Sequence, residues 1–238
     1  MDKFNYEWVE KRPIHETFTV GALLAVVGGF LDAYTYILRG GVFANAQTGN
    51  IVLLAVNSAQ GNGKQAMYYL APITAFILGI SATEFLKKKY SHATFMAWEH
   101  MILLLEIALL LVVGFIPQSV SDDVVNVMIS FICSIQVNSF RKIKGMTYAS
   151  TMCTGNLRSG TENIMQYFIN KDEVAGKKAA HYFGIIILFI IGAILGAIFS
   201  DKYGVRSVWI CCVALLLVFC LMLGGEHEKK RQRSKRKE

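Results

Sequence analysis

The chain has 238 residues, of which 54% are hydrophobic and 17% charged, and its net charge is +7. A soluble domain usually carries about 25% charged residues. Because apolar runs of about 18 residues recur along the chain, the composition excludes disordered chains, disulfide-rich secreted scaffolds and nucleic-acid-binding modules, and it indicates an integral membrane protein.

Six apolar runs are long enough to cross about 30 Å of hydrocarbon. Residues 1–16 hold no apolar core and no small-residue cleavage site, so we expect the first run itself to act as the export signal. The six predicted spans are residues 17–38, 70–86, 98–116, 124–140, 182–199 and 208–223.

Two further segments resemble helices but cannot cross lipid alone. Residues 51–56 form only a short apolar stretch before the polar turn around Gly61. Residues 157–169 include Arg158 and Glu162. We therefore expect both segments to end on the side of the membrane on which they begin.

The distribution of Lys and Arg favours six crossings over eight. Six crossings with both ends inside place 20 of the 24 Lys and Arg residues on the cytoplasmic side, including the seven of the basic tail 226–238. Eight crossings would place Arg141 outside and the Asp122-Asp123 pair inside. We expect the tail to contact anionic lipid headgroups and not nucleic acid.

The two halves of the chain share a repeated pattern. A shift of 106 residues superimposes Thr48-Gly49-Asn50 on Thr154-Gly155-Asn156, and each triplet opens one of the two poor helical segments. The match extends backwards without a gap and pairs Leu31 with Val137, Asp32 with Asn138, Ala33 with Ser139, Tyr34 with Phe140, Ile37 with Ile143 and Ala44 with Ser150.

Each half then holds three crossings, and an odd number forces the two halves into opposite orientations, as in many secondary transporters. The predicted fold class is all-α: a polytopic membrane protein with six crossing helices and two re-entrant half-helices in an inverted 3+3 repeat. The expected parts are a cytoplasmic segment at 1–16, a first membrane repeat at 17–116, a second at 117–225 and the tail at 226–238.

Two stretches in the first half, Gly28-Gly29-Phe30-Leu31-Asp32-Ala33 and Gly41-Val42-Phe43-Ala44-Asn45-Ala46-Gln47-Thr48-Gly49-Asn50, resemble the YoaK-like family. Gln136, Asn138 and Thr154-Gly155-Asn156 fit the same pattern, and the resemblance covers residues 15 to 225. The family consists of bacterial membrane proteins classed as a domain of unknown function. The resemblance therefore implies a bacterial plasma membrane setting and no substrate.

Asp32 is the most informative single residue. A carboxylate inside a span costs about 2.5 to 3.5 kcal/mol on insertion scales, so it should face a partner or water. One interpretation is a proton or cation site, with Arg39 two turns along the same face. The other is a structural hydrogen-bond acceptor that joins neighbouring helices.

Glu106 lies in the middle of the third predicted span. Its isolation among leucines predicts either a protonated carboxyl group or a partner such as Arg39 or His181. Proton coupling and a structural bond between helices both remain open for this residue.

The Thr-Gly-Asn triplets are interpreted as helix starts inside the membrane, with Thr48 and Thr154 as caps and glycines that admit a close approach. Two such starts favour an anion or a neutral polar solute; the alternative is that the glycines only permit tight helix crossing. The predicted substrate-binding or pore residues are Asp32, Asn45, Gln47, Thr48, Gly49, Asn50, Gln136, Asn138, Thr151, Thr154, Gly155 and Asn156, with Asp32 and Glu106 for coupling.

These patterns predict a transporter of a small polar or anionic solute, coupled to protons or cations. The alternatives are an uncoupled channel and a non-transporting scaffold or sensor. The cysteines and histidines show no metal-ligand spacing and no catalytic motif occurs, so we expect no cofactor, no metal and no enzymatic activity. The lipid bilayer is the expected partner. The sequence does not decide whether the protein forms a homo-oligomer.

Overall fold

The computed structural model describes residues 14–90, 98–143, 146–147 and 153–235. The described chain is almost entirely helical, apart from a two-residue hairpin of β1 (Lys142–Ile143) and β2 (Met146–Thr147). Its helices are η1 (Ile14–Glu16), α2 (Phe18–Leu38), α3 (Gln47–Ala59), α4 (Gly63–Tyr90), α5 (Trp98–Phe115), α6 (Asp122–Ser139), α7 (Cys153–Asn170), α8 (Glu173–Tyr203), η2 (Gly204–Val208) and α9 (Trp209–Lys235).

Local sequence explains several helix ends. The Thr17 hydroxyl accepts a 3.4 Å hydrogen bond from the backbone N–H of Val20 and caps α2. The Asp172 carboxylate caps α8 in the same way, by accepting from Val174 and Ala175. Between α3 and α4, Gly61 takes the positive φ of 75° that the tight turn requires.

A helix lies at each predicted span and at each of the two polar segments. Three helices, α4, α8 and α9, are longer than the apolar runs, because polar turns extend them beyond the hydrophobic stretch: α8 begins at Glu173, and α9 continues through most of the basic tail to Lys235. Residues 1–13, Thr151 and the last three residues of the tail lie outside the described residues.

By length and composition, the described residues contain four stretches that could cross a membrane: Phe18–Leu38, Gly63–Lys88, Trp98–Phe115 and Glu173–Gly225. The last stretch joins α8 and α9 across η2. Helix α6 is not among the four, since Asp122, Asp123 and several buried polar residues lower its mean hydropathy; the buried ones are Asn126, Ser130, Ser134, Gln136 and Asn138.

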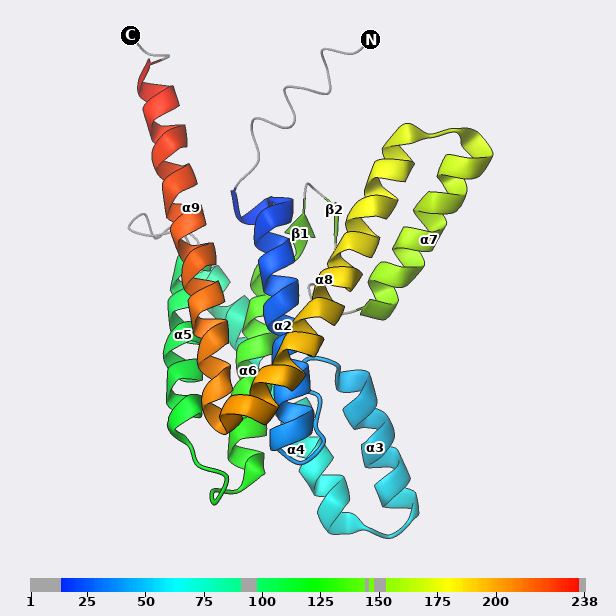
Figure 1. Ribbon diagram of the computed structural model, residues 1–238, viewed down its shortest axis with the longest axis vertical. Helices are drawn as coiled ribbons and strands as arrows, with labels where there is room; N and C mark the ends of the chain where they lie inside the picture. The colour runs from blue at the N-terminus through cyan, green and yellow to red at the C-terminus, as the bar shows by residue number, and fades with distance from the viewer. Residues whose placement is uncertain (1–13, 91–97, 144–145, 148–152, 236–238) are drawn as a thin grey trace.

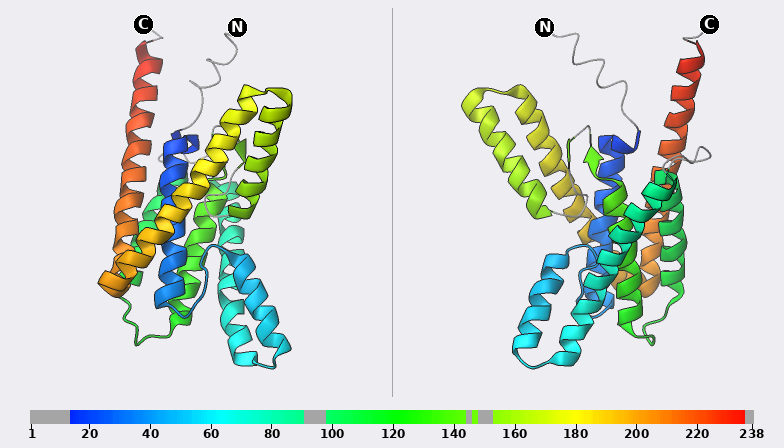
Figure 2. Two further views of the ribbon diagram at one scale, coloured as in Figure 1. Left: turned by 45° about the vertical axis from the view of Figure 1, so that its right-hand side comes forward. Right: turned by 180° about the vertical axis from the view of Figure 1, so that it is seen from behind.

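The helices run up and down one long axis (Figures 1 and 2). The first turn of α2 and the last turns of α9 lie at the same end. Helix α3 begins near mid-height and runs to the lower end in Figure 1, where it turns into α4. Helix α7 also begins near mid-height but runs to the upper end, where it turns into α8. The two hairpins therefore point in opposite directions.

The most extensive helix contacts join α2 with α8 and α4 with α6. Glycines make both contacts possible, because their backbones touch the partner helix directly. A Cβ at Gly192 would lie 2.1 Å from the Val26 carbonyl oxygen, and one at Gly29 would lie 2.0 Å from the Phe189 carbonyl oxygen. A Cβ at Gly79 of α4 would likewise meet α6. Small residues at such crossings are typical of membrane helices.

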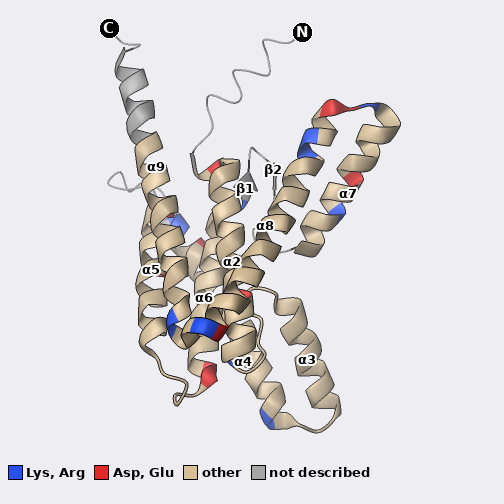
Figure 3. Cartoon of the chain, viewed as in Figure 1, with Lys and Arg blue, Asp and Glu red and all other residues tan. Residues whose placement is uncertain are grey.

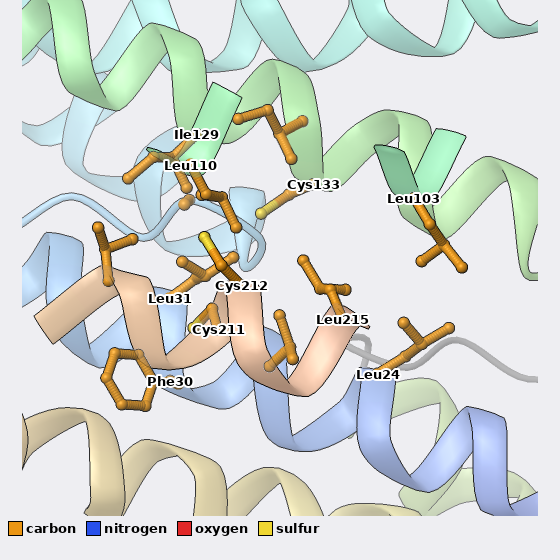
Figure 4. Packing of buried hydrophobic residues seen from close by; sticks show 14 of the residues in the cluster. Leu24, Phe30, Leu31, Leu103, Leu110, Ile129, Cys133, Cys211, Cys212 and Leu215 are labelled. Atoms are coloured by element: carbon orange, nitrogen blue, oxygen red, sulfur yellow. The ribbon is translucent and has the colours of Figure 1, made fainter. Parts of the chain in front are cut away.

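One hydrophobic core joins α2, α5, α6 and α9. Figure 4 shows Leu24, Phe30 and Leu31 of α2 packed with leucines of α5 and with Cys211, Cys212 and Leu215 of α9. Cys133 of α6 completes this layer. Three of the five cysteines thus serve as small buried packing residues.

The outer surface between the two ends is apolar. Large side chains along α8, among them Ile187, Ile190 and Ile194, are about half exposed or more, and charged side chains gather mainly toward the ends of the molecule (Figure 3). Monomeric soluble proteins rarely expose apolar surface this extensive. The fold is therefore that of a polytopic helical membrane protein.

Candidate functional site

A cavity of about 620 Å³ lies where the starts of α3 and α7 meet α2, α4 and α8. Such a volume is in the usual range for a small-molecule site. Thr48 of α3 and Thr154 and Gly155 of α7 all line it, so the two Thr-Gly-Asn triplets contribute to one space. Its other polar lining residues are Asp32, Asn45 and Gln47.

Asp32 has a structural role as well as a place in the cavity wall. Its Oδ1 accepts a 2.7 Å hydrogen bond from the backbone N–H of Asn45, and the backbone amides of Ala44 and Ala46 also interact with this carboxylate. These amides lie just before the first turn of α3. A negative charge at a helix start stabilises the helix, so Asp32 of α2 holds α3 in place.

Asn45 binds back to α2. Its Nδ2 donates a 3.2 Å hydrogen bond to the Gly28 carbonyl oxygen, which identifies the other amide atom as the oxygen. This Oδ1 is buried and has no hydrogen-bond donor among the described residues. A lining residue of the cavity therefore keeps one free acceptor.

Asn50 holds the loop before α3 instead of lining the cavity. It is fully buried, its Oδ1 accepts from the Phe43 N–H at 3.2 Å, and its Nδ2 donates to the Phe43 carbonyl and to Gln47 Oε1 at 2.7 and 2.9 Å. A Cβ on Gly49 would also lie against the Phe43 ring. Asn50 and Gly49, both predicted to face a solute, are not among the residues that line this cavity, because both pack against Phe43.

The predicted capping role of Thr48 is wrong. Helix α3 starts one residue before Thr48, and its N-cap is Ala46, which makes no side-chain cap. The Asp32 carboxylate binds the loop amides just before the helix, and Thr48 lies inside the first turn, on the cavity wall. Thr154 is likewise inside α7, and the residues before Cys153 are outside the described part of the chain.

Helix α7 leaves free space at its start. An added Cβ at Gly155 would meet no atom of the described residues within 4 Å, and Gly155 lines the cavity. Asn156 is buried with an interaction partner and is not among the lining residues. The two triplets are therefore alike in position, with their threonines on the cavity and their asparagines packed away from it.

Gln136, Asn138 and Glu106 lie outside this cavity. Gln136 Nε2 donates a 2.6 Å hydrogen bond to Glu106 Oε1, which joins α6 to α5. Of the alternatives for Glu106, the described residues show a bond between helices and no basic partner: Gln136 binds Oε1, and Oε2 has no hydrogen-bond partner among the described residues. Asn138 Nδ2 donates to Glu84 at 2.7 Å, and the Asn138 carbonyl accepts from Lys87.

Arg39 is fully buried and turned away from Asp32. Its Nη2 donates a 2.6 Å hydrogen bond to the Ile116 carbonyl, and its Nη1 lies 3.5 Å from Asp122. The expected proximity of Arg39 and Asp32 along one face therefore gives no ion pair, because the carbonyl groups at the end of α5 bind the guanidinium.

Four aromatic rings in the cavity wall were not predicted: Tyr36, Phe43, Phe76 and Phe189. They come from α2, the loop before α3, α4 and α8, and Tyr36 stacks on Phe43 with ring centroids 5.0 Å apart. Nothing in the local sequence distinguishes these rings from those that face lipid.

Together, the apolar exterior and the helical fold define a polytopic α-helical membrane protein, with a partly open cavity among its helices. The chain belongs to the family described as "Protein of unknown function (DUF1275)", whose model matches residues 20–221. It is 26% identical over 210 residues to the UPF0700 transmembrane protein YoaK of Bacillus subtilis (strain 168), an alignment that covers 86% of this chain and 92% of the relative. No solved structure matches the chain. The resemblance to the YoaK-like family is thereby confirmed.

Proposed function

We propose that this protein is a transporter of a small polar solute, and that the cavity between α3 and α7 is its binding site. The observation that carries the proposal is that Thr48 and Thr154, at equivalent places in the two halves, line one cavity. Non-helical backbone at membrane depth is tolerated where it borders such a space, and transporter sites are commonly built from helix starts of two repeats.

The proposed topology has six crossings, α2, α4, α5, α6, α8 and α9, with α3 and α7 as half-helices in inverted repeats. The opposite directions of the α3 and α7 hairpins support it (Figure 2). So does the pairing of helices: the repeat equates α2 with α6 and α8 with α4, and the two most extensive contacts are α2 with α8 and α6 with α4. Both termini then lie in the cytoplasm of a bacterial cell.

We assign the coupling of transport to a proton or cation to Asp32. Asp32 is the charged residue among the described lining residues of the cavity, so it is placed to bind a proton or cation in exchange with solute. Glu106 has no contact with this cavity and bonds to Gln136. An anionic solute is the weaker candidate, because it would approach the Asp32 carboxylate.

The test uses Cys153, which lines the cavity. In a Cys220→Ala chain the other three cysteines are buried, so an impermeant thiol reagent reports on Cys153 alone. A transport site must open to each side of the membrane in turn. We expect labelling of Cys153 in intact cells and also in inside-out vesicles, and none in a Cys153→Ser control.

Labelling from one side only, or from neither, would reject transport through this cavity and favour a scaffold or sensor. If both sides react, the flux of solute against an imposed proton gradient separates the coupled transporter from an uncoupled channel. Only a coupled transporter can accumulate solute against its own gradient.

A further inference from the structure

The volume of the cavity indicates only a small molecule, whereas the chemistry of its wall indicates a particular class of solute. We propose that the site binds a small organic cation: a protonated amine beside Asp32 and Asn45, with an apolar body against the aromatic rings. This inference rests on the cavity assigned above as the transport site.

Acceptor groups without a cationic partner lie at one side of the cavity. Asp32 is 5% exposed, and no Lys, Arg or His side chain among the described residues pairs with it; Arg39 binds the end of α5. The neighbouring Asn45 keeps a buried Oδ1 with no donor in the described part of the chain. A buried carboxylate and a free carbonyl oxygen both gain from an N–H donor that carries positive charge.

The helix starts do not reverse this preference. A helix N-terminus acts as about half a positive charge, and the starts of both α3 and α7 border the cavity. Together they can at most offset the single negative charge of Asp32. An anion beside Asp32 would still meet a like charge at close range.

The rest of the wall suits an apolar body. Tyr36, Phe43, Phe76 and Phe189 come from four different parts of the fold and line the same space. Ring faces attract cations as well as apolar groups. A molecule with an amine at one end and an aromatic or aliphatic group at the other would match both parts of the wall.

The experiment compares three probes of one shape: 2-phenylethylammonium, 2-phenylethanol and phenylacetate, which are a cation, a neutral molecule and an anion at pH 7. Purified Cys220→Ala protein in detergent is treated with a maleimide, and each probe is titrated as a protectant of Cys153. We expect the cation to protect at a concentration at least tenfold lower than the alcohol, and phenylacetate to protect least.

Asp32→Asn should remove most of the difference between the protecting concentrations of the cation and the alcohol. If this variant does not fold, the comparison of the three probes on the unmodified Asp32 chain still decides. Equal protection by cation and alcohol, stronger protection by phenylacetate, or no protection by any probe would overturn the proposal.

The assay measures binding in detergent and does not depend on transport. A preference for the cation together with one-sided labelling of Cys153 in membranes would support the cation site and reject the transporter. Labelling of Cys153 from both sides without a preference for the cation would support the transporter and reject the cation site. The two proposals therefore fail on different measurements.

Discussion

Thr48 and Thr154 line the same cavity although 106 positions separate them in the chain. Each lies in the first turn of a short helix that begins near mid-height, and the two helices run to opposite ends of the molecule (Figure 1). This relationship connects the repeat in the sequence to a site in the fold. It also makes specific predictions about topology, stability and function.

The ends of the two half-helices should lie on opposite sides of the membrane. Single cysteines are placed at Asn62 and Asn170, both exposed, in a Cys153→Ser, Cys220→Ala chain. Asn62 is preferred over Gly61, whose φ of 75° would strain a cysteine. An impermeant maleimide added to intact cells should label the cysteine at 62 and not that at 170. Labelling of both from one side would contradict the inverted arrangement.

Glu106→Gln should keep the protein folded and functional. The new amide can still bond to Gln136, and the change removes a buried carboxyl whose Oε2 has no partner among the described residues. We expect equal or higher thermal stability and unchanged two-sided labelling of Cys153. By contrast, Glu106→Leu leaves Gln136 unpaired and should lower the free energy of unfolding by about 1 to 3 kcal/mol.

If Glu106→Gln folds normally but restricts labelling of Cys153 to one side, the carboxyl takes part in the conformational cycle. The assignment of coupling to Asp32 alone would then be wrong. The Gln136→Leu variant is the matching control, because it removes the same hydrogen bond and leaves the carboxyl in place.

Gly192→Ala should separate α2 from α8. The added Cβ would lie 2.1 Å from the Val26 carbonyl oxygen, and backbone on both sides cannot move without displacing the whole helix. We expect a loss of about 2 kcal/mol or more, in the range of overpacked cores, measured as a lower melting temperature in detergent. Gly224→Ala on α9, where a Cβ meets nothing within 4 Å, should leave the melting temperature unchanged.

Asn50→Ala should loosen the loop that carries Phe43 into the cavity wall. The change removes hydrogen bonds to both backbone groups of Phe43 and one to Gln47, and it leaves buried polar groups unpaired at a cost of about 1 to 3 kcal/mol. The melting temperature and protection of Cys153 by 2-phenylethylammonium should both fall. Asn57→Ala, which removes a bond within α3 only, is the matched control; equal effects of the two changes would refute this role of Asn50.

The sequence by itself determined the membrane class and the positions of the helices. Apolar length is a local property, so the stretches around α2, α5 and α8 could be identified without any knowledge of their neighbours. The shared triplets also pointed to Thr48 and Thr154, because a repeat preserves position. Asp32 was identifiable because a carboxylate inside an apolar run is costly unless it has a partner or contacts water.

Only the tertiary structure decided which polar groups meet. Asn50 and Thr154 look equivalent as candidates in the sequence, yet one binds Phe43 and the other lines the cavity. Arg39 and Glu106 have their partners on other helices, at Ile116 and Gln136. Helical spacing predicts on which face of a helix a residue lies, but not which other helix packs against this face. The energy of a buried polar group depends on that neighbour.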